Sequence, residues 1–209
     1  MVHRVLKRRT GTPPDKLVTQ IMGYSSGKET VKRRGDPRLH GHEMEDKARQ
    51  HYIEHMHDRG DHVTVSQHGL FVSAEHPYIG SSIDGMIHGT DKGPGVLEIK
   101  CPVSEQPIDV LAKKRKSFCL KLSDGHLQLK TSHMYYCQLH MEMAITGCSW
   151  ANFVVFTASG TSTNIHIEKV PFNEEYWKEC LQKIESFYRS FVVLELVTRR
   201  LKRNISLLP

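Results

Sequence analysis

Two short segments, SSIDG at residues 81–85 and LEIKCP at residues 97–102, decide the fold of this 209-residue chain. In an extended strand successive side chains alternate between the two faces, so Glu98 and Lys100 should share one face. The residues between the segments are rich in glycine, proline and aspartate, and this predicts that the two segments pair as a β-hairpin. Such a hairpin brings Asp84 towards Glu98 and Lys100.

Two carboxylates and an ammonium on one face suit a divalent metal ion that activates water against a phosphodiester. Asp84 and Glu98 are the candidate metal ligands, and the backbone carbonyl of Ile99 is available between them. Hard oxygen ligands of this kind favour Mg²⁺ or Mn²⁺. Lys100 would orient the water or stabilise the charge that grows on the phosphate. The same pattern also occurs on solvated strand faces, so it needs support from the rest of the chain.

That support comes from a resemblance to the YqaJ-type viral recombinase family, relatives of phage lambda exonuclease among the PD-(D/E)xK nucleases. Besides the hairpin, residues 45–52 resemble its first motif, E-x-x-A-R-x-x-Y, and residues 135–147 resemble its Tyr-Tyr-x-Gln helix. The three blocks follow in the family's order, and the resemblance covers roughly residues 15–195. It implies an α/β (α+β) fold with a restriction-endonuclease-like core, a mixed β-sheet flanked by helices.

The resemblance also assigns roles to residues outside the hairpin. It implies that Glu45 lies at the rim of the metal site, with Glu43 as the alternative. It implies that Gln138 faces the catalytic site and that Tyr135 or Tyr136 supports the site and contacts DNA. The structural alternative for this last helix is that its tyrosine, leucine and methionine side chains pack against the sheet and have no role in the site.

The composition fits a polyanionic partner. Lys and Arg number 29 against 23 Asp and Glu, which gives a net charge of +6. The candidate DNA-binding cluster is Lys113, Lys114, Arg115 and Lys116. Such clusters are usually solvated faces, and in a eukaryotic host this one could also act as a nuclear import signal.

Cysteine usage and hydropathy indicate a soluble intracellular protein. The five cysteines are odd in number and lack CxxC spacing, which indicates reduced thiols. No hydrophobic segment follows the first residues, and no apolar run reaches the about 18 residues that a membrane span needs.

The chain is expected to form one main domain. The prediction comprises a flexible basic lead over residues 1–14, the nuclease domain over 15–198 and a basic tail over 199–209. Outside the hairpin, helices are expected near 15–22, 39–59, 130–146 and from 173 onward, and strands near 62–66, 69–73, 152–157 and 163–169. Residues 103–128 are expected to be irregular or a short helix.

Taken together, these features predict a Mg²⁺-dependent deoxyribonuclease. The resemblance adds an exonuclease mode on the ends of double-stranded DNA, 5′-to-3′ polarity, a role in recombination or repair, a single-strand annealing protein as partner and a ring-shaped homo-oligomer. The alternatives are a non-catalytic DNA-binding recombination protein and a sequence-specific endonuclease that shares the site.

A histidine motif suggests a different class of enzyme. His51, Glu54 and His55 fit the H-x-x-E-H pattern of some zinc peptidases. The chain has 14 histidines, so a chance match is easy, and no third ligand is evident. A solvated helix face is the preferred interpretation.

Overall fold

The computed structural model describes residues 1–9, 11–24, 37–104, 106–159 and 162–208. The chain divides into two compact units, and each is described by itself. The larger unit is Lys32–Asn173, and the terminal unit joins Met1–Val31 to Glu174–Pro209. No helix among the described residues is both long enough and apolar enough to span a bilayer.

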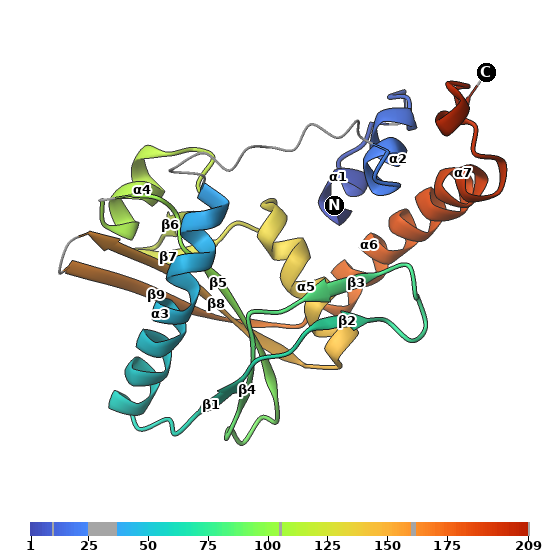
Figure 1. Cartoon of the computed structure of the whole chain (residues 1–209). Helices are drawn as coiled ribbons and strands as arrows, with labels where there is room; N and C mark the ends of the chain where they lie inside the picture. The colour runs from blue at the N-terminus through green and yellow to red at the C-terminus, as the bar shows by residue number, and fades with distance from the viewer. Residues whose placement is uncertain (10, 25–36, 105, 160–161, 209) are drawn as a thin grey trace. The chain divides into compact units, whose positions relative to one another are not determined.

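The larger unit is built on a five-stranded mixed sheet (Figure 1). Its strand order is β1 (Thr64–Ser66), β4 (Gly85–His88), β5 (Gly95–Lys100), β8 (Trp150–Ser159) and β9 (Ser162–Pro171). Only the β5–β8 pair is parallel, and the other three pairs are antiparallel. The fold class predicted from the sequence, a mixed sheet flanked by helices, is confirmed.

The predicted hairpin is the β4–β5 pair. The strands are antiparallel with Gly85 opposite Leu97. Two of its glycines are required by close packing. A Cβ on Gly85 would lie 2.4 Å from Cγ1 of Val65, and one on Gly95 would lie 2.4 Å from the ring of Trp150.

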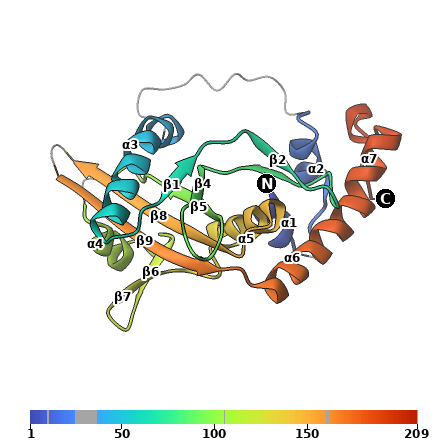
Figure 2. The same ribbon diagram turned by 90° about the horizontal axis from the view of Figure 1, so that it is seen from below.

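Both faces of the sheet are covered by helices (Figures 1 and 2). Leu97 and Ile99 of β5 belong to the core under α3 (Pro37–Asp58), with Ala48 and Tyr52 of that helix. The opposite face packs against α5 (Met134–Thr146) and α4 (Ile108–Lys114). Residues at alternating positions of β5 therefore face different helices, and Glu98 and Lys100 face α5.

Two small strand pairs complete the larger unit. β2 (Leu70–Val72) pairs with β3 (Gly80–Ser82), and β6 (Leu120–Ser123) pairs with β7 (His126–Leu129). The β6–β7 hairpin corrects the expectation of irregular or short helical structure over residues 103–128. Its turn has positive φ at Asp124 (51°) and Gly125 (81°), as a two-residue hairpin turn requires. The Asp-Gly dipeptide was the signal that could have predicted it.

The terminal unit is helical. It contains α1 (Val2–Leu6), α2 (Asp15–Ile21), α6 (Glu174–Phe187), a π-helical turn (Tyr188–Val192), α7 (Val193–Thr198) and a 3₁₀ turn (Leu201–Arg203). Its core consists of Val18, Phe187, Val192 and Leu207.

Residues at both chain ends make contacts within the terminal unit. Val5 of α1 packs against the core of the terminal unit, and the Arg8 guanidinium lies 5.1 Å from the ring centroid of Phe191. At the other end, the Asp15 carboxylate accepts hydrogen bonds from Ser206 Oγ (2.7 Å) and the backbone N–H of Leu207 (3.1 Å). The predicted domain limits at residues 15 and 198 do not coincide with the limits of the two units.

Candidate active site

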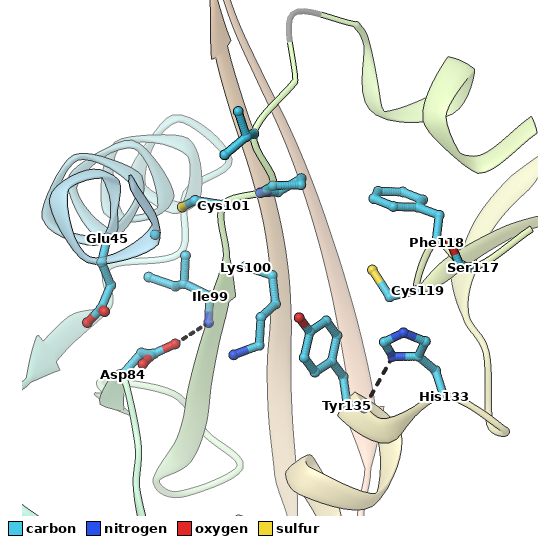
Figure 3. Close-up of a pocket in the computed structure, with 13 residues that line it drawn as sticks. Glu45, Asp84, Ile99, Lys100, Cys101, Ser117, Phe118, Cys119, His133 and Tyr135 are labelled. Carbon is cyan, nitrogen blue, oxygen red and sulfur yellow. Dashed lines mark hydrogen bonds between the residues drawn. The ribbon is translucent and has the colours of Figure 1, made fainter. Parts of the chain in front are cut away.

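A pocket of about 640 Å³ lies at the C-terminal end of β5, within the larger unit. We call it the hairpin pocket. Its lining includes Glu45 from α3, Asp84, and Ile99 and Lys100 from β5 (Figure 3). Tyr135 of α5 lies beside Lys100 on the other side of β5 from Glu45. The pocket therefore brings together five of the twelve residues that the sequence assigned to the site.

Asp84 is held in place by the backbones of two elements. It lies between β3 and β4, and its Oδ2 accepts a 2.6 Å hydrogen bond from the backbone N–H of Ile99. Its own backbone carbonyl accepts from Nε of Arg49 on α3 (3.2 Å). The register begins with Gly85 opposite Leu97, so Asp84 directly precedes the paired part of β4.

Glu45 is positioned by the helix that carries it. Arg49, one turn further along α3, is buried and forms ion pairs with Glu45 (2.8 Å) and Asp46. Both Glu45 and Asp84 line the hairpin pocket, and in Figure 3 their carboxylates point towards the same part of it. Arg49 also contacts the backbone carbonyl of Asp84, a link between α3 and the hairpin that no local sequence pattern indicates.

Glu98 lies behind the pocket and is almost fully buried, with 1 % of its surface exposed. Its Oε1 accepts hydrogen bonds from Lys100 Nζ and from Gln138 Nε2 (2.6 Å). Its Oε2 has no hydrogen-bond partner among the described residues. Burial, and then the nearby charge of Glu142, raise the pKa of Glu98 well above its usual range.

Lys100 is charged at neutral pH. Burial alone would lower the pKa of Lys100, but the charges of Glu98 and Asp84 outweigh it and raise the pKa. The ammonium also lies 4.8 Å from the ring centroid of Tyr135. It is thus a cation held between the acids and the ring of Tyr135.

Glu142 is a second buried carboxylate that the sequence analysis missed. It is fully buried, and its Oε1 accepts from Gln138 Nε2 (2.8 Å) and Ser81 Oγ (3.1 Å). Burial raises its pKa to about 7. The available signal was its position four residues after Gln138 on one helix face. Ser81, Glu142, Gln138 and Glu98 form one continuous hydrogen-bonded chain.

The two candidate tyrosines have different surroundings. Tyr135 lines the hairpin pocket. Both tyrosines pack against the core on the α5 face, but Tyr136 does not line the pocket, and its ring lies 4.3 Å from that of His140, centroid to centroid. Direct contact with DNA is therefore easier to reconcile with Tyr135, and both roles remain predictions.

The basic cluster lies close to the pocket in sequence. Lys113 and Lys114 end α4, Arg115 and Lys116 follow, and all four are exposed. The next three residues, 117–119, line the hairpin pocket. Lys130 Nζ donates to the backbone carbonyls of Lys116 (2.8 Å) and Phe118 (2.7 Å), which fixes this connection.

Neither a zinc-peptidase site at His51 nor a cysteine nucleophile in the hairpin pocket is supported by the described residues. His51 stacks on Phe156, with the ring centroids 5.2 Å apart, and in the described part of the chain no group of three or more His, Cys, Asp or Glu side chains is arranged to hold a metal ion. The five cysteines are thiols and form no disulfide, and burial raises the pKa of Cys101 to about 12 and of Cys119 to about 11. Both pocket cysteines are therefore protonated at neutral pH and poor nucleophiles.

The acidic side chains thus lie in and behind one pocket, but they are not arranged around a common point as metal ligands would be. Glu45 pairs with Arg49, and Glu98 turns towards Lys100 and Gln138. The donor chemistry nevertheless fits a hard divalent cation, because the carboxylates of Glu45 and Asp84 line the same pocket and Glu98 retains a buried oxygen that accepts no hydrogen bond from the described residues.

The fold is that of known nucleases. The alkaline exonuclease LHK-Exo from Laribacter hongkongensis has a TM-score of 0.64 at 21% sequence identity, covering 97% of this chain and 91% of that chain. LHK-Exo in complex with dAMP has a TM-score of 0.65 at 21% identity, covering 97% and 89%. No curated protein sequence matches the chain.

The family follows from the sequence match. The family model of the YqaJ-like viral recombinase domain matches residues 5–149. This is more than half of the chain, and the chain belongs to that family. The resemblance that the hairpin and the two flanking motifs indicated is confirmed, and the matched range contains all the candidate site residues.

Proposed function

We propose that this protein is a metal-dependent deoxyribonuclease that degrades linear double-stranded DNA from its ends. The observation that carries the proposal is the hairpin pocket, which Asp84 and Glu45 line together with Lys100. Membership of the YqaJ-like viral recombinase family and the LHK-Exo fold support a nuclease.

The proposed cofactor is Mg²⁺ or Mn²⁺. Asp84, Glu98, the backbone carbonyl of Ile99 and Glu45 would hold it, because hard cations prefer oxygen ligands. When bound, such an ion polarises the phosphate and lowers the pKa of a water molecule. The Oε2 atom of Glu98 is buried and has no hydrogen-bond partner among the described residues, so a bound cation would satisfy it.

The chain's own residues would position the substrate. Lys100 has no lone pair as an ammonium, so it donates hydrogen bonds to the phosphate or the attacking water and binds no metal. Gln138 donates a hydrogen bond to the carboxylate of Glu98 and thereby orients it. The ammonium held near the attacked phosphate stabilises the charge that develops there.

The finer parts of the proposal rest on the family. They are 5′-to-3′ polarity, a role in recombination or repair, a single-strand annealing partner and a ring-shaped homo-oligomer. End-labelled duplexes test polarity, since label at a 5′ end is released early by a 5′-to-3′ enzyme. Light scattering of the purified protein tests the oligomer.

The central experiment incubates the purified protein with linear and with covalently closed circular duplex DNA, with Mg²⁺ or with EDTA. The proposal expects degradation of the linear DNA with Mg²⁺ and no degradation in EDTA. Closed circles should survive, because an exonuclease needs an end. Cleavage of circles would identify an endonuclease, and DNA binding without cleavage in Mg²⁺ or Mn²⁺ would identify a non-catalytic recombination protein.

A further inference from the structure

A second pocket, of about 660 Å³, lies at the C-terminal end of α3, and we call it the α3-end pocket. Its walls come from the end of α3, the connection to β1, the β4–β5 turn, and strands β8 and β9. Glu45 of the hairpin pocket lies 14 residues before Arg59 in the sequence. At 1.5 Å per helical residue the two pockets are about 20 Å apart along the direction of α3.

The charged side chains of the α3-end pocket are mainly basic. Three cations line it, namely Arg59, Lys92 and Lys169. Two carboxylates, of Asp61 and Asp91, oppose them. Three imidazoles, of His55, His62 and His166, also line the pocket. The pocket therefore favours an anion.

One cation is placed over a fixed aromatic surface. The Nζ atom of Lys169 lies 3.7 Å from the ring centroid of Trp150. The indole packs so closely on β5 that a Cβ on Gly95 would lie 2.4 Å from it. Partial burial and then the charge of Lys92 lower the pKa of Lys169, and the charge of Asp61 only partly offsets them. Two ammonium groups therefore repel each other in this pocket, and a bound anion would relieve that repulsion.

Apolar side chains line the pocket beside these charges. Met56, Ile165 and Ile167 are partly buried and offer a surface for a sugar or a base. A volume of several hundred Å³ is in the range of small-ligand sites.

We propose that the α3-end pocket binds the phosphate of a nucleotide through Arg59, Lys92 and Lys169, with the nucleoside against the apolar wall. The phosphate belongs either to a free mononucleotide or to a DNA strand, and the experiment distinguishes these two sources. The site is separate from the hairpin pocket, and its binding can be measured without catalysis.

The test uses the fluorescence of Trp150 in the full-length protein. The chain has two tryptophans, so Trp177→Phe on α6 leaves Trp150 as the only reporter. This variant is titrated in EDTA with thymidine 5′-monophosphate, thymidine, inorganic phosphate and a short duplex. Lys169→Gln and Arg59→Gln are then compared in the same background. Lys121→Gln, exposed on β6, is the matched control.

We expect thymidine 5′-monophosphate to change the fluorescence at lower concentration than inorganic phosphate, and thymidine to have little effect. A response to the duplex without one to the mononucleotide would assign the phosphate to a DNA strand. Removing one charged hydrogen bond should weaken binding about tenfold or more in Lys169→Gln and Arg59→Gln. Lys121→Gln should bind normally.

Calorimetric titration with the same ligands gives a second measure of affinity that does not depend on the indole. Circular dichroism checks that each variant is folded, and both substituted residues are exposed. The proposal is overturned if neither phosphate-bearing probe binds, or if Lys169→Gln and Arg59→Gln bind as well as Lys121→Gln does. Because no turnover is measured, these outcomes are independent of the proposed nuclease activity.

Discussion

The two pockets at the ends of α3 have nearly equal volumes but hold their charges in different ways. Behind the hairpin pocket, Glu98 and Glu142 have 1 % and 0 % of their surface exposed. In the α3-end pocket, Arg59, Lys92 and Lys169 are exposed to solvent.

This difference has an energetic meaning. Moving a carboxylate out of water is costly, and a single ammonium does not fully compensate two of them. Exposed cations cost little, so they give weak evidence for a role without further support. The buried acids therefore mark the hairpin pocket as the site where function is maintained at the expense of stability.

The largest effect should come from removing a carboxylate of the hairpin pocket. Asp84→Asn and Glu98→Gln should each reduce degradation of linear duplex DNA to an undetectable level, because each removes a charged oxygen ligand. Glu98→Gln also removes the ion-pair partner of the Lys100 ammonium, so its free energy of unfolding should be lower than that of the wild type. Digestion assays and urea denaturation measure the two effects.

Exposed acids provide the matched controls. Asp58→Asn and Glu75→Gln alter carboxylates on the surface and should leave digestion unchanged. A wild-type rate in Asp84→Asn would contradict the assignment of the site.

The next effect concerns the cation of the same pocket. Lys100→Ala should lower single-turnover digestion by about 10²–10³-fold, the scale of losing one transition-state donor, while DNA binding persists. Lys100→Arg should restore little activity, since a planar guanidinium differs from an ammonium in reach and geometry. Lys121→Ala is the control. Near wild-type digestion by Lys100→Ala would reduce this residue to a structural partner of Glu98.

A third experiment tests the cost of the buried carboxylate directly. The pKa of Glu142 is raised from 4.5 to about 7, so the folded protein holds this proton more tightly than the unfolded chain. Stability should therefore fall as pH rises through this range, by up to about 3 kcal/mol. Glu142→Gln has no titratable group at this position and does not lose this stability. The difference in free energy of unfolding, variant minus wild type, should therefore increase from about pH 5 to about pH 8.

Urea denaturation at the two pH values, without metal, measures that difference. Glu75→Gln is the control, because its carboxylate is exposed. A constant difference between Glu142→Gln and wild type would show that Glu142 does not titrate in this range.

The smallest effect is expected from exposed cations. Replacing Lys113, Lys114, Arg115 and Lys116 by glutamine should reduce the slope of log K for DNA against log[salt] by about 0.9 for each phosphate that the cluster neutralises in the wild type. Lys178→Gln with Lys183→Gln, both on the exposed part of α6, is the control. An unchanged slope would make the cluster a solvated surface.

Local sequence patterns were sufficient to predict much of the fold. The β4–β5 hairpin was predictable because alternation within a strand and a turn-rich connection are properties of neighbouring residues. The helices that became α3 and α5 were predictable for the same reason. The β6–β7 hairpin was missed although its Asp124-Gly125 turn is also local.

The sequence by itself determined which residues of β5 share a face, and the family motifs added Glu45 and Gln138. Only the tertiary structure decided what that face meets. Glu142 approaches Glu98 because α5 covers the side of the sheet towards which Glu98 points, and Gln138 bridges the two carboxylates. Likewise, Arg59, Lys92 and Lys169 share a pocket only because the β4–β5 turn, β9 and the end of α3 converge there. Burial depends on contacts between segments far apart in the chain, and no periodicity within one segment reports them.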